Sequence, residues 1–210
     1  SWMAGGLFAV RNPVAPVVIR VSSYGPLLGA ASDGPITIDR RAVWALELAA
    51  MRRAAAVYAP SRFLAHHIAA RTNLDVRVVR PPFYVDPDGE DPTVARKLAG
   101  FAPYLLFFGR ISRLKGAGLL AEAVTPLLDE LPDLHLIVAG PEGGDPTVAQ
   151  LMSLEHRAPH RVHHAGILPP HVLRPVIRAA RAVVLPSLAD NLPNTCLEAM
   201  GLGQLVIGPN

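Results

Sequence analysis

Two acidic residues, Asp190 and Glu198, stand close together in the last quarter of the chain. The apolar run before them, residues 182–185, is typical of a buried strand, and Asn194 or Thr195 can cap the helix that follows. Both acids therefore belong to a strand-to-helix loop, which is where an open α/β sheet binds its ligands. The acid pair predicts a ligand site at this edge of a sheet.

Two basic residues follow another predicted strand. The continuous apolar run 104–108 leads into Gly109 and Arg110, with Lys115 shortly after. A forked guanidinium and an ammonium group in a water-poor cleft can stabilise negative charge that develops on a phosphate. Either residue alone is equally well explained as a solvated surface cation, because most such side chains lie on the surface. Together with the acids, they favour a phosphorylated ligand.

The elements that must position these residues alternate along the chain, which predicts parallel sheets covered by helices. Expected strands are 16–21, 56–59, 76–79, 104–108, 134–139, 161–165, 182–185 and 205–207. Expected helices are 39–54 with an aspartate cap, 61–71, 118–130, 147–156, 170–180 and the one that bears the acids. Pro126 and Pro175 are expected to bend or interrupt their helices.

A proline- and acid-rich segment at 86–100 predicts a linker between the two halves of the chain. The halves would be residues 1–85 and 101–210. Each would carry its own parallel sheet.

The segment around the two acids resembles the nucleotide-sugar motif of retaining glycosyltransferases of the GT-B fold, in particular glycosyltransferase family 4 (group 1 glycosyl transferases). In that family two glutamates stand at this spacing before an Ala-Met pair, here Ala199-Met200. A Gly-Arg followed by Lys-Gly, here Gly109-Arg110 and Lys115-Gly116, is also similar to the family in order and spacing.

The resemblance implies roles for the four charged residues. Asp190 would face the donor sugar and Glu198 the ribose hydroxyls, while Arg110 and Lys115 would hold the pyrophosphate and stabilise the leaving nucleoside diphosphate. From the residues alone another interpretation stays open for Glu198, because Thr195-x-x-Glu198 also has the form of a capping box.

The resemblance also implies that neighbouring loops contact the substrate. The expected substrate-binding residues are Gly109, Gly140, Pro141, Ile167, Leu168, Asn191, Leu192 and Thr195. For the loop after residue 139 the alternative is a turn-rich connection without a ligand.

The chain departs from the family pattern at three places. Aspartate replaces the first glutamate, and Asn191-Leu192-Pro193 replaces Gly-Phe-Gly, so that Pro193 offers no N–H to a phosphate. Where many members have a histidine after an acceptor-domain strand, this chain has Ser22-Ser23-Tyr24. One of these side chains could bond the donor sugar or the acceptor, or the three could simply end the strand.

The fold class implied is α/β and GT-B-like: two Rossmann-like parallel-sheet domains that face a cleft. Residues 1–85 would be the later part of the acceptor-side domain, and 101–210 a donor-binding domain incomplete at its carboxyl end. We therefore expect the sequence to be the middle and larger part of such an enzyme.

Composition limits which classes of ligand and which cell compartments suit the chain. Twenty basic against 17 acidic residues, without a long basic run, argue against a nucleic-acid surface and are compatible with an anionic ligand such as a nucleotide sugar. The single cysteine, Cys196, allows no internal disulfide and fits reducing cytosol. No stretch is long and apolar enough for a transmembrane helix, so we expect a cytoplasmic protein with peripheral contact at the inner membrane surface as one option.

The resulting hypothesis is an NDP-sugar-dependent, hexosyltransferase-type enzyme that transfers a sugar with retention to an unknown acceptor hydroxyl, in glycan, polysaccharide or glycolipid synthesis. Lipid-linked glycans are among the candidate acceptors. No metal or other cofactor is expected, because the two cations take the place of a metal at the phosphates. The alternatives are an epimerase or a phosphorylase of the same architecture, a dinucleotide-dependent oxidoreductase, disfavoured by the lack of Gly-x-Gly-x-x-Gly after a strand, and a non-catalytic sugar-nucleotide binding module.

Overall fold

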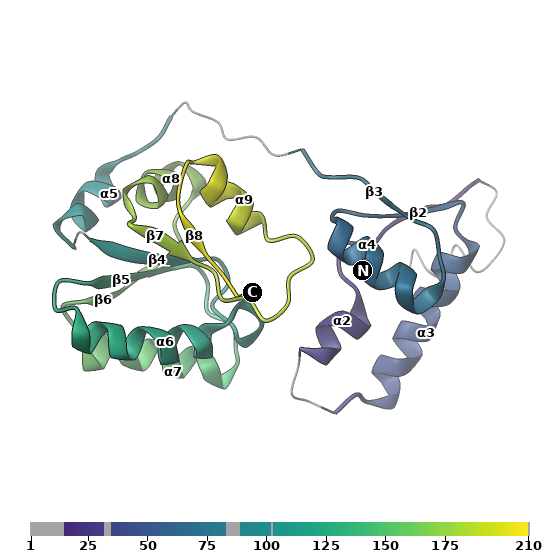
Figure 1. Ribbon diagram of the computed structural model, residues 1–210, viewed down its shortest axis with the longest axis horizontal. Coiled ribbons are helices and arrows are strands. Elements are labelled where there is room, and N and C mark those ends of the chain that lie inside the picture. The colour runs from purple at the N-terminus through teal and green to yellow at the C-terminus, as the bar shows by residue number, and fades with distance from the viewer. Residues whose placement is uncertain (1–14, 32–34, 83–88, 102, 210) are drawn as a thin grey trace. The chain divides into compact units, whose positions relative to one another are not determined.

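The computed structural model describes residues 15–31, 35–82, 89–101 and 103–209. The chain divides into two compact units between Pro82 and Phe83 (Figure 1). Each unit is built on a parallel sheet.

The first unit has a three-stranded sheet in the order β1-β2-β3, with β1 at Val18–Arg20, β2 at Ala56–Ala59 and β3 at Val76–Val78. Its helices are α2 (Gly25–Ala30), α3 (Ile38–Arg53) and α4 (Arg62–Thr72). Apolar side chains from strands and helices form one core, which includes Val21, Met51, Val57, Leu64 and Ile68.

The second unit has a five-stranded parallel sheet in the order β6-β5-β4-β7-β8. The strands are β4 (Tyr104–Phe108), β5 (His135–Ala139), β6 (Val162–Gly166), β7 (Ala182–Val184) and β8 (Val206–Ile207). The central strand β4 is almost continuously apolar because helices cover both faces of a parallel sheet.

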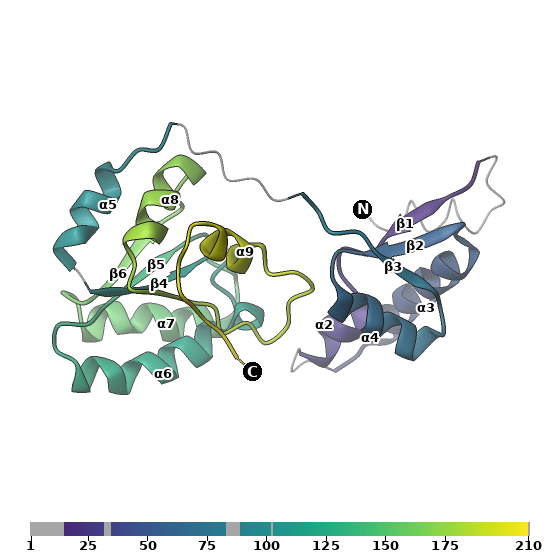
Figure 2. The same cartoon turned by 45° about the horizontal axis from the view of Figure 1, so that its top comes forward.

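Two helical layers cover this second sheet (Figures 1 and 2). Helices α6 (Ala117–Glu130) and α7 (Pro146–Arg157) share a core with Phe107, Leu136 and Val138. On the other face lie α5 (Thr93–Leu98), α8 (Pro170–Ala179) and α9 (Asn194–Gly201), packed against Leu106, Ile137 and Val183. Two short 3-10 helices, η1 (Ala99–Phe101) and η2 (Arg113–Lys115), flank β4.

One buried polar bond ties the sheet to the second layer. The Tyr104 hydroxyl donates a hydrogen bond of 2.7 Å to the Val176 carbonyl of α8, and burial raises the pKa of Tyr104 to about 12. The bond satisfies a polar atom that would otherwise be costly to bury.

The order of the strands places a switch point beside β4. The chain runs from β4 outward through β5 to β6 and then returns to place β7 on the opposite side of β4. The loops after β4 and β7 therefore diverge at the carboxyl end of the sheet, which is where such folds bind ligands. Arg110 and Lys115 follow β4, and Asp190 follows β7.

The structure confirms all eight predicted strands, with ends shifted by at most two residues, and corrects the segments between them. The predicted linker at 86–100 is wrong in part. Residues 86–88 lie outside the described residues. Helix α5 lies within the predicted linker and buries Ala95 and Leu98 against α8 and β4. Helix α2 was missed, because Gly25, Pro26 and Gly29 hide a helical pattern.

One prediction about a helix end is wrong, and one about helix interiors is wrong in part. Helix α3 is capped by Thr37, whose side chain accepts a hydrogen bond from the Arg40 amide, and Asp39 lies in the first turn instead. Pro126 and Pro175 do not interrupt α6 and α8, since both prolines lie inside continuous helices.

Candidate functional site

The loops after β4 and β7 touch through their backbones. The Leu188 amide donates a 2.9 Å hydrogen bond to the Leu114 carbonyl. Gly116 has a φ of +80°, and a Cβ there would lie 1.9 Å from the Pro186 carbonyl oxygen. Only glycine permits both this left-handed conformation and this approach. The turn that carries Lys115 is therefore fixed against the loop that carries Asp190.

Lys115 and Asp190 form an ion pair across these loops. The Lys115 ammonium contacts Asp190 Oδ2, and the two side chains are 32% and 19% exposed. Partial burial strengthens the attraction beyond that of a fully solvated pair. A cation and an acid that are 75 residues apart in sequence thus meet at the switch point of the sheet.

The loop after β5 supports the Lys115 turn from the other side. Gly109 and Ile111 amides donate to the Ala139 and Pro141 carbonyls, each at 2.9 Å. Gly140 has a φ of +142°, and a Cβ there would lie 1.9 Å from the Gly109 carbonyl oxygen. The two loops therefore lie against each other along their backbones.

Asp145, at the end of the loop after β5, links this loop to the turn that carries Lys115. Its Oδ2 accepts a 2.9 Å hydrogen bond from the Arg113 amide, while Oδ1 accepts one of 3.2 Å from the Thr147 amide and so caps α7. Burial by itself would raise the pKa of Asp145, but the hydrogen bonds from Thr147 and from the Arg113 and Val148 amides outweigh it and lower the pKa. Sequence analysis missed this residue, although Asp145-Pro146-Thr147 is a helix-start pattern.

Glu198 is not a capping residue. Helix α9 begins at Asn194, its N-cap is Pro193, and no side chain makes a cap hydrogen bond. The prediction that Asn194 or Thr195 caps the helix is therefore wrong, and the alternative of a capping box at Thr195-x-x-Glu198 is excluded. The capping interpretation of Glu198 loses its basis, and the ligand interpretation remains.

Glu198 lies half-buried in α9. Burial is the main influence on this carboxyl and raises its pKa, whereas the positive charge of Arg174 on α8 acts in the opposite direction. Acids with a raised pKa are frequent in binding sites, and Glu198 lies near the carboxyl-end edge of the sheet, where such folds bind ligands.

The start of α9 reaches the end of β4. The Cγ2 methyl of Thr195 lies 3.3 Å from where a Cβ of Gly109 would be, and Gly109 has a φ of +121°. Asn191 and Leu192 are half-buried in the preceding loop. Thr195, Asn191 and Leu192 thus stand on the same edge as the ion pair.

Arg110 lies apart from this contact. Its side chain is exposed, and within the described part of the chain it does not join the ion pair of Lys115. The structure therefore brings together Lys115 and Asp190 directly and leaves Arg110 on the surface of the same loop.

The remaining predicted residues lie on the loops after β5 and β6. Gly140 and Pro141 contact the β4 loop as described, Leu168 packs against the core, and the Ile167 side chain is 73% exposed. His164 of β6, for which the sequence predicts no role, lies against the loop after β5: its Nε2 lies 3.4 Å from the Gly140 carbonyl oxygen and its Nδ1 3.8 Å from Glu142 Oε1.

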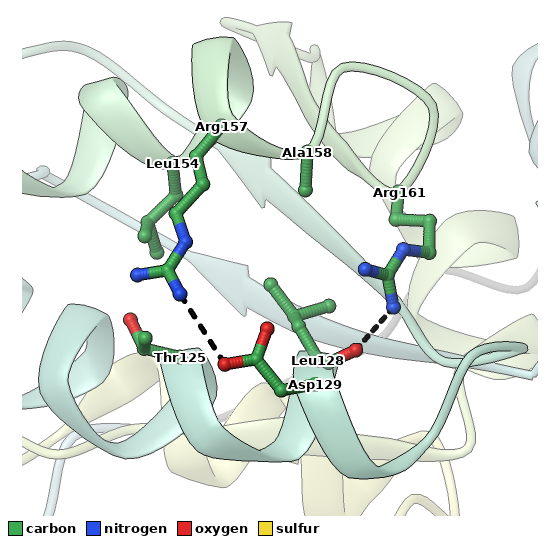
Figure 3. A pocket seen from close by; sticks show the side chains of 7 residues that line it. All are labelled: Thr125, Leu128, Asp129, Leu154, Arg157, Ala158 and Arg161. Atoms are coloured by element: carbon green, nitrogen blue, oxygen red, sulfur yellow. Dashed lines mark hydrogen bonds and ion pairs between the residues drawn. The ribbon is translucent and has the colours of Figure 1, made fainter.

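A pocket at the opposite end of the strands is lined in part by residues that pair with one another (Figure 3). Arg157 bonds Asp129 at 3.2 Å, and Arg161 donates to the Leu128 carbonyl near the end of α6. Arg161 thus satisfies carbonyls at the carboxyl end of α6, and Arg157, in the last turn of α7, pairs with a side-chain carboxylate, so both arginines have structural roles. Among the described residues, no group of three or more His, Cys, Asp or Glu could hold a metal ion.

In the first unit, the segment Ser22-Ser23-Tyr24 follows β1. Tyr24 is 7% exposed, forms the N-cap residue of α2, and lies edge-on to the His67 ring at 5.9 Å. Burial is the main cause of the raised pKa of Tyr24. For Tyr24, these contacts favour the interpretation that it ends the strand and joins the core.

The chain is similar to known proteins in sequence and in structure. The family described as glycosyl transferases group 1 matches residues 102–210, just over half of the chain. The D-inositol 3-phosphate glycosyltransferase of Corynebacterium jeikeium is 32% identical over 149 residues, 65% of this chain and 36% of that protein. The 2-deoxystreptamine glucosyltransferase of Streptomyces kanamyceticus is 29% identical over 96% of this chain and 53% of its own length. The chain thus spans about half or less of these curated relatives.

Solved structures match nearly the whole chain. Anabaena HepE in complex with UDP and glucose has a TM-score of 0.71 at 22% identity, over 99% of this chain and 57% of that one. Sucrose-phosphate synthase from Thermosynechococcus elongatus has a TM-score of 0.76 at 20% identity, over 99% and 54%. These likenesses confirm the predicted α/β, GT-B-like fold class.

Proposed function

Because the chain belongs to the group 1 glycosyl transferases, we propose that it acts in transfer of a hexosyl unit from a nucleoside diphosphate sugar to an acceptor hydroxyl, with retention of anomeric configuration. The ion pair of Lys115 and Asp190 at the switch point carries this proposal. It supplies a cation for phosphate and an acceptor for sugar hydroxyls at one place.

Each charged residue has a distinct part in the proposed reaction. Lys115 and Arg110 offset the negative charge that grows on the outer phosphate as the bond to the sugar breaks. The Asp190 carboxylate accepts hydrogen bonds from sugar hydroxyls and orients the ring. Glu198, on the helix that follows, accepts hydrogen bonds from the ribose.

The surrounding loops fix these groups before the substrate arrives. The Lys115 turn is held by Asp145 on one side and by the Leu188 amide and Pro186 on the other. Such preorganisation reduces the reorganisation needed during reaction, and so favours catalysis. Neither a metal nor another cofactor has a part in this proposal.

The names of the relatives guide the choice of acceptor. D-Inositol 3-phosphate and 2-deoxystreptamine are both substituted six-carbon rings that carry several hydroxyls. We propose a polyhydroxylated ring, free or as part of a glycan or glycolipid, as the acceptor class.

Thermal shift with UDP, GDP and ADP sugars tests the donor class. UDP-glucose comes first, because UDP and glucose occupy the HepE structure. We expect one nucleotide sugar to stabilise the protein, and Lys115→Ala to abolish the shift while Lys97→Ala, on the exposed side of α5, keeps it. Stabilisation by NAD(P) alone, or no shift with any donor, would contradict the proposal.

NMR of the product tests retention and separates the alternative functions. An α-linked product from an α-linked donor is expected. An altered sugar still attached to the nucleotide would indicate an epimerase, and donor binding without transfer to any polyol would indicate a binding module.

We also propose a cytoplasmic location with peripheral contact at an anionic membrane surface. Residues 1–82 contain ten arginines and four acids, a net charge of +6 from ten minus four. Along α3, Ile38 (84% exposed) and Leu46 (50% exposed) stand among the exposed Arg41 and Arg52, a mixture that suits anionic headgroups. No helix among the described residues has the length and apolar character needed to span a membrane. Sedimentation with anionic but not with neutral vesicles is expected, and equal sedimentation with both would contradict the proposal.

A further inference from the structure

The ion pair of Lys115 and Asp190 has a consequence for which ligand the site prefers. Within the chain, Asp190 serves as the counterion of Lys115, the same ammonium group proposed to bind the diphosphate. A diphosphate oxygen that approaches Lys115 must therefore approach the Asp190 carboxylate as well. The two anions repel each other while they compete for one cation.

The two loops keep Lys115 and Asp190 close together, so the carboxylate cannot easily move away from a bound diphosphate. The Leu188 amide bonds the Leu114 carbonyl, and Gly116 lies against Pro186, so that the bases of both side chains are held in place. The side chains are only 32% and 19% exposed, which leaves less water to screen the repulsion.

From this geometry we infer that Asp190 is a specificity-determining residue that makes the site favour a nucleoside diphosphate sugar over the free nucleoside diphosphate. The inference rests on the proposed function and deepens it. The donor is the substrate and the free diphosphate is the product, so the same residue promotes product release.

Charge and hydrogen bonding both support this preference. The pyrophosphate of a nucleotide sugar carries about two negative charges, whereas a free diphosphate has a terminal phosphate that adds about half to one further charge near pH 7. The donor sugar also brings hydroxyls that can donate to Asp190 and replace its bond to Lys115. The free diphosphate brings more repulsion and has no such hydroxyls at that place.

The size of the effect follows from Coulomb's law. An extra half charge about 6 Å from a carboxylate, at an effective dielectric constant of about 20, changes a dissociation constant by about tenfold. Removing the charge of Asp190 should relieve this penalty for the diphosphate. It should also remove the best acceptor for the donor sugar.

Asp190→Asn tests the inference by titration calorimetry with UDP and UDP-glucose, or with the nucleotide pair that the thermal-shift panel selects. We expect UDP to bind about tenfold more tightly and UDP-glucose to bind equally or more weakly, so the preference for the donor collapses. Asp129→Asn is the matched control, because it removes the same charge from an ion pair at the other end of the strands and should leave both affinities unchanged. Asp190→Glu keeps the charge and should keep the preference.

Several results would overturn the inference. An unchanged ratio of the two affinities, weaker UDP binding by Asp190→Asn, or the same change in Asp129→Asn would each do so, with the melting temperature showing that the variants are folded. If UDP affinity stays constant while transfer is lost, Asp190 contacts the sugar and the proposed function survives without the inference. If the wild-type protein binds no member of the panel, the proposed function fails and the inference fails with it.

Discussion

Gly116→Ala tests whether the contact between the loops builds the site. Gly116 has a φ of +80°, and its new Cβ would meet the Pro186 carbonyl oxygen at 1.9 Å. The oxygen belongs to the backbone and the position of the Cβ is fixed by the backbone of residue 116, so a rotamer change cannot relieve the overlap. The Pro186 loop, which leads to Asp190, must move by more than 1 Å, on the order of the difference from a normal contact.

A matched variant separates this overlap from backbone strain. Gly203 has a φ of +79°, and nothing lies within 4 Å of a Cβ placed there. Gly203→Ala should therefore cost only the left-handed conformation, about 1–2 kcal/mol, reduced by about 0.5 kcal/mol because alanine restricts the unfolded chain. Gly116→Ala should cost that amount and about 1–3 kcal/mol more for the overlap.

Urea unfolding and nucleotide titration measure the two consequences. We expect Gly116→Ala to lose about 2–4 kcal/mol of unfolding free energy and to bind the donor at least tenfold more weakly, since displacement of about 1 Å is costly at a catalytic site. Gly203→Ala should keep its affinity. If the two variants are equally stable and both bind the donor normally, the loop contact does not build the site.

Three further predictions concern single side chains. Asp145→Ala should weaken donor binding, because the Arg113 amide and the start of α7 lose their hydrogen-bond acceptor. Since the folded pKa of Asp145 is lowered, its contribution to stability is present above the unfolded pKa and is lost as the pH falls. Urea unfolding at pH 7 and at pH 3 should therefore show a smaller change in unfolding free energy with pH in the variant than in the wild-type protein. Glu198→Gln should weaken nucleoside diphosphate binding in calorimetry without loss of stability. Because burial raises the folded pKa of Glu198, its contribution to stability is present below the unfolded pKa and lost as the pH rises, so the variant should be equally or more stable at pH 8. A loss of about 1 kcal/mol with unchanged nucleotide affinity would contradict the ribose role and indicate a structural one. Arg110→Ala or Lys115→Ala should lower turnover by about two to three powers of ten in a transfer assay, the cost of one charge-stabilising group, and a normal rate in either variant would refute its role at the phosphate.

Local features of the sequence were sufficient for the strands and for most of the helices. The apolar run Tyr104–Phe108 became β4 as predicted, because a strand that is buried on both faces needs apolar residues throughout. The segment around Thr93–Leu98 was different. Its proline-rich and acidic surroundings favoured a linker, but Ala95 and Leu98 gain enough burial against α8 and β4 to form α5.

Helix ends were less predictable, because competing caps differ little in free energy. Thr37 caps α3 where Asp39 was expected, and α9 begins after Pro193 without a side-chain cap. This last result changed the interpretation of Glu198. A residue that could have been one half of a capping box is instead a half-buried acid within the helix.

Residue types and their positions after predicted strands were enough to place the candidates Arg110, Lys115 and Asp190 on loops after strands, whereas Glu198 was expected on such a loop and lies inside α9. Tertiary structure was needed to show that Lys115 pairs with Asp190, that Arg110 does not do so within the described residues, and that Asp145 supports the Lys115 turn. These contacts depend on the order of strands in the sheet, which places both β5 and β7 beside β4. Strand order is set by packing between segments far apart in the chain, which local patterns do not encode.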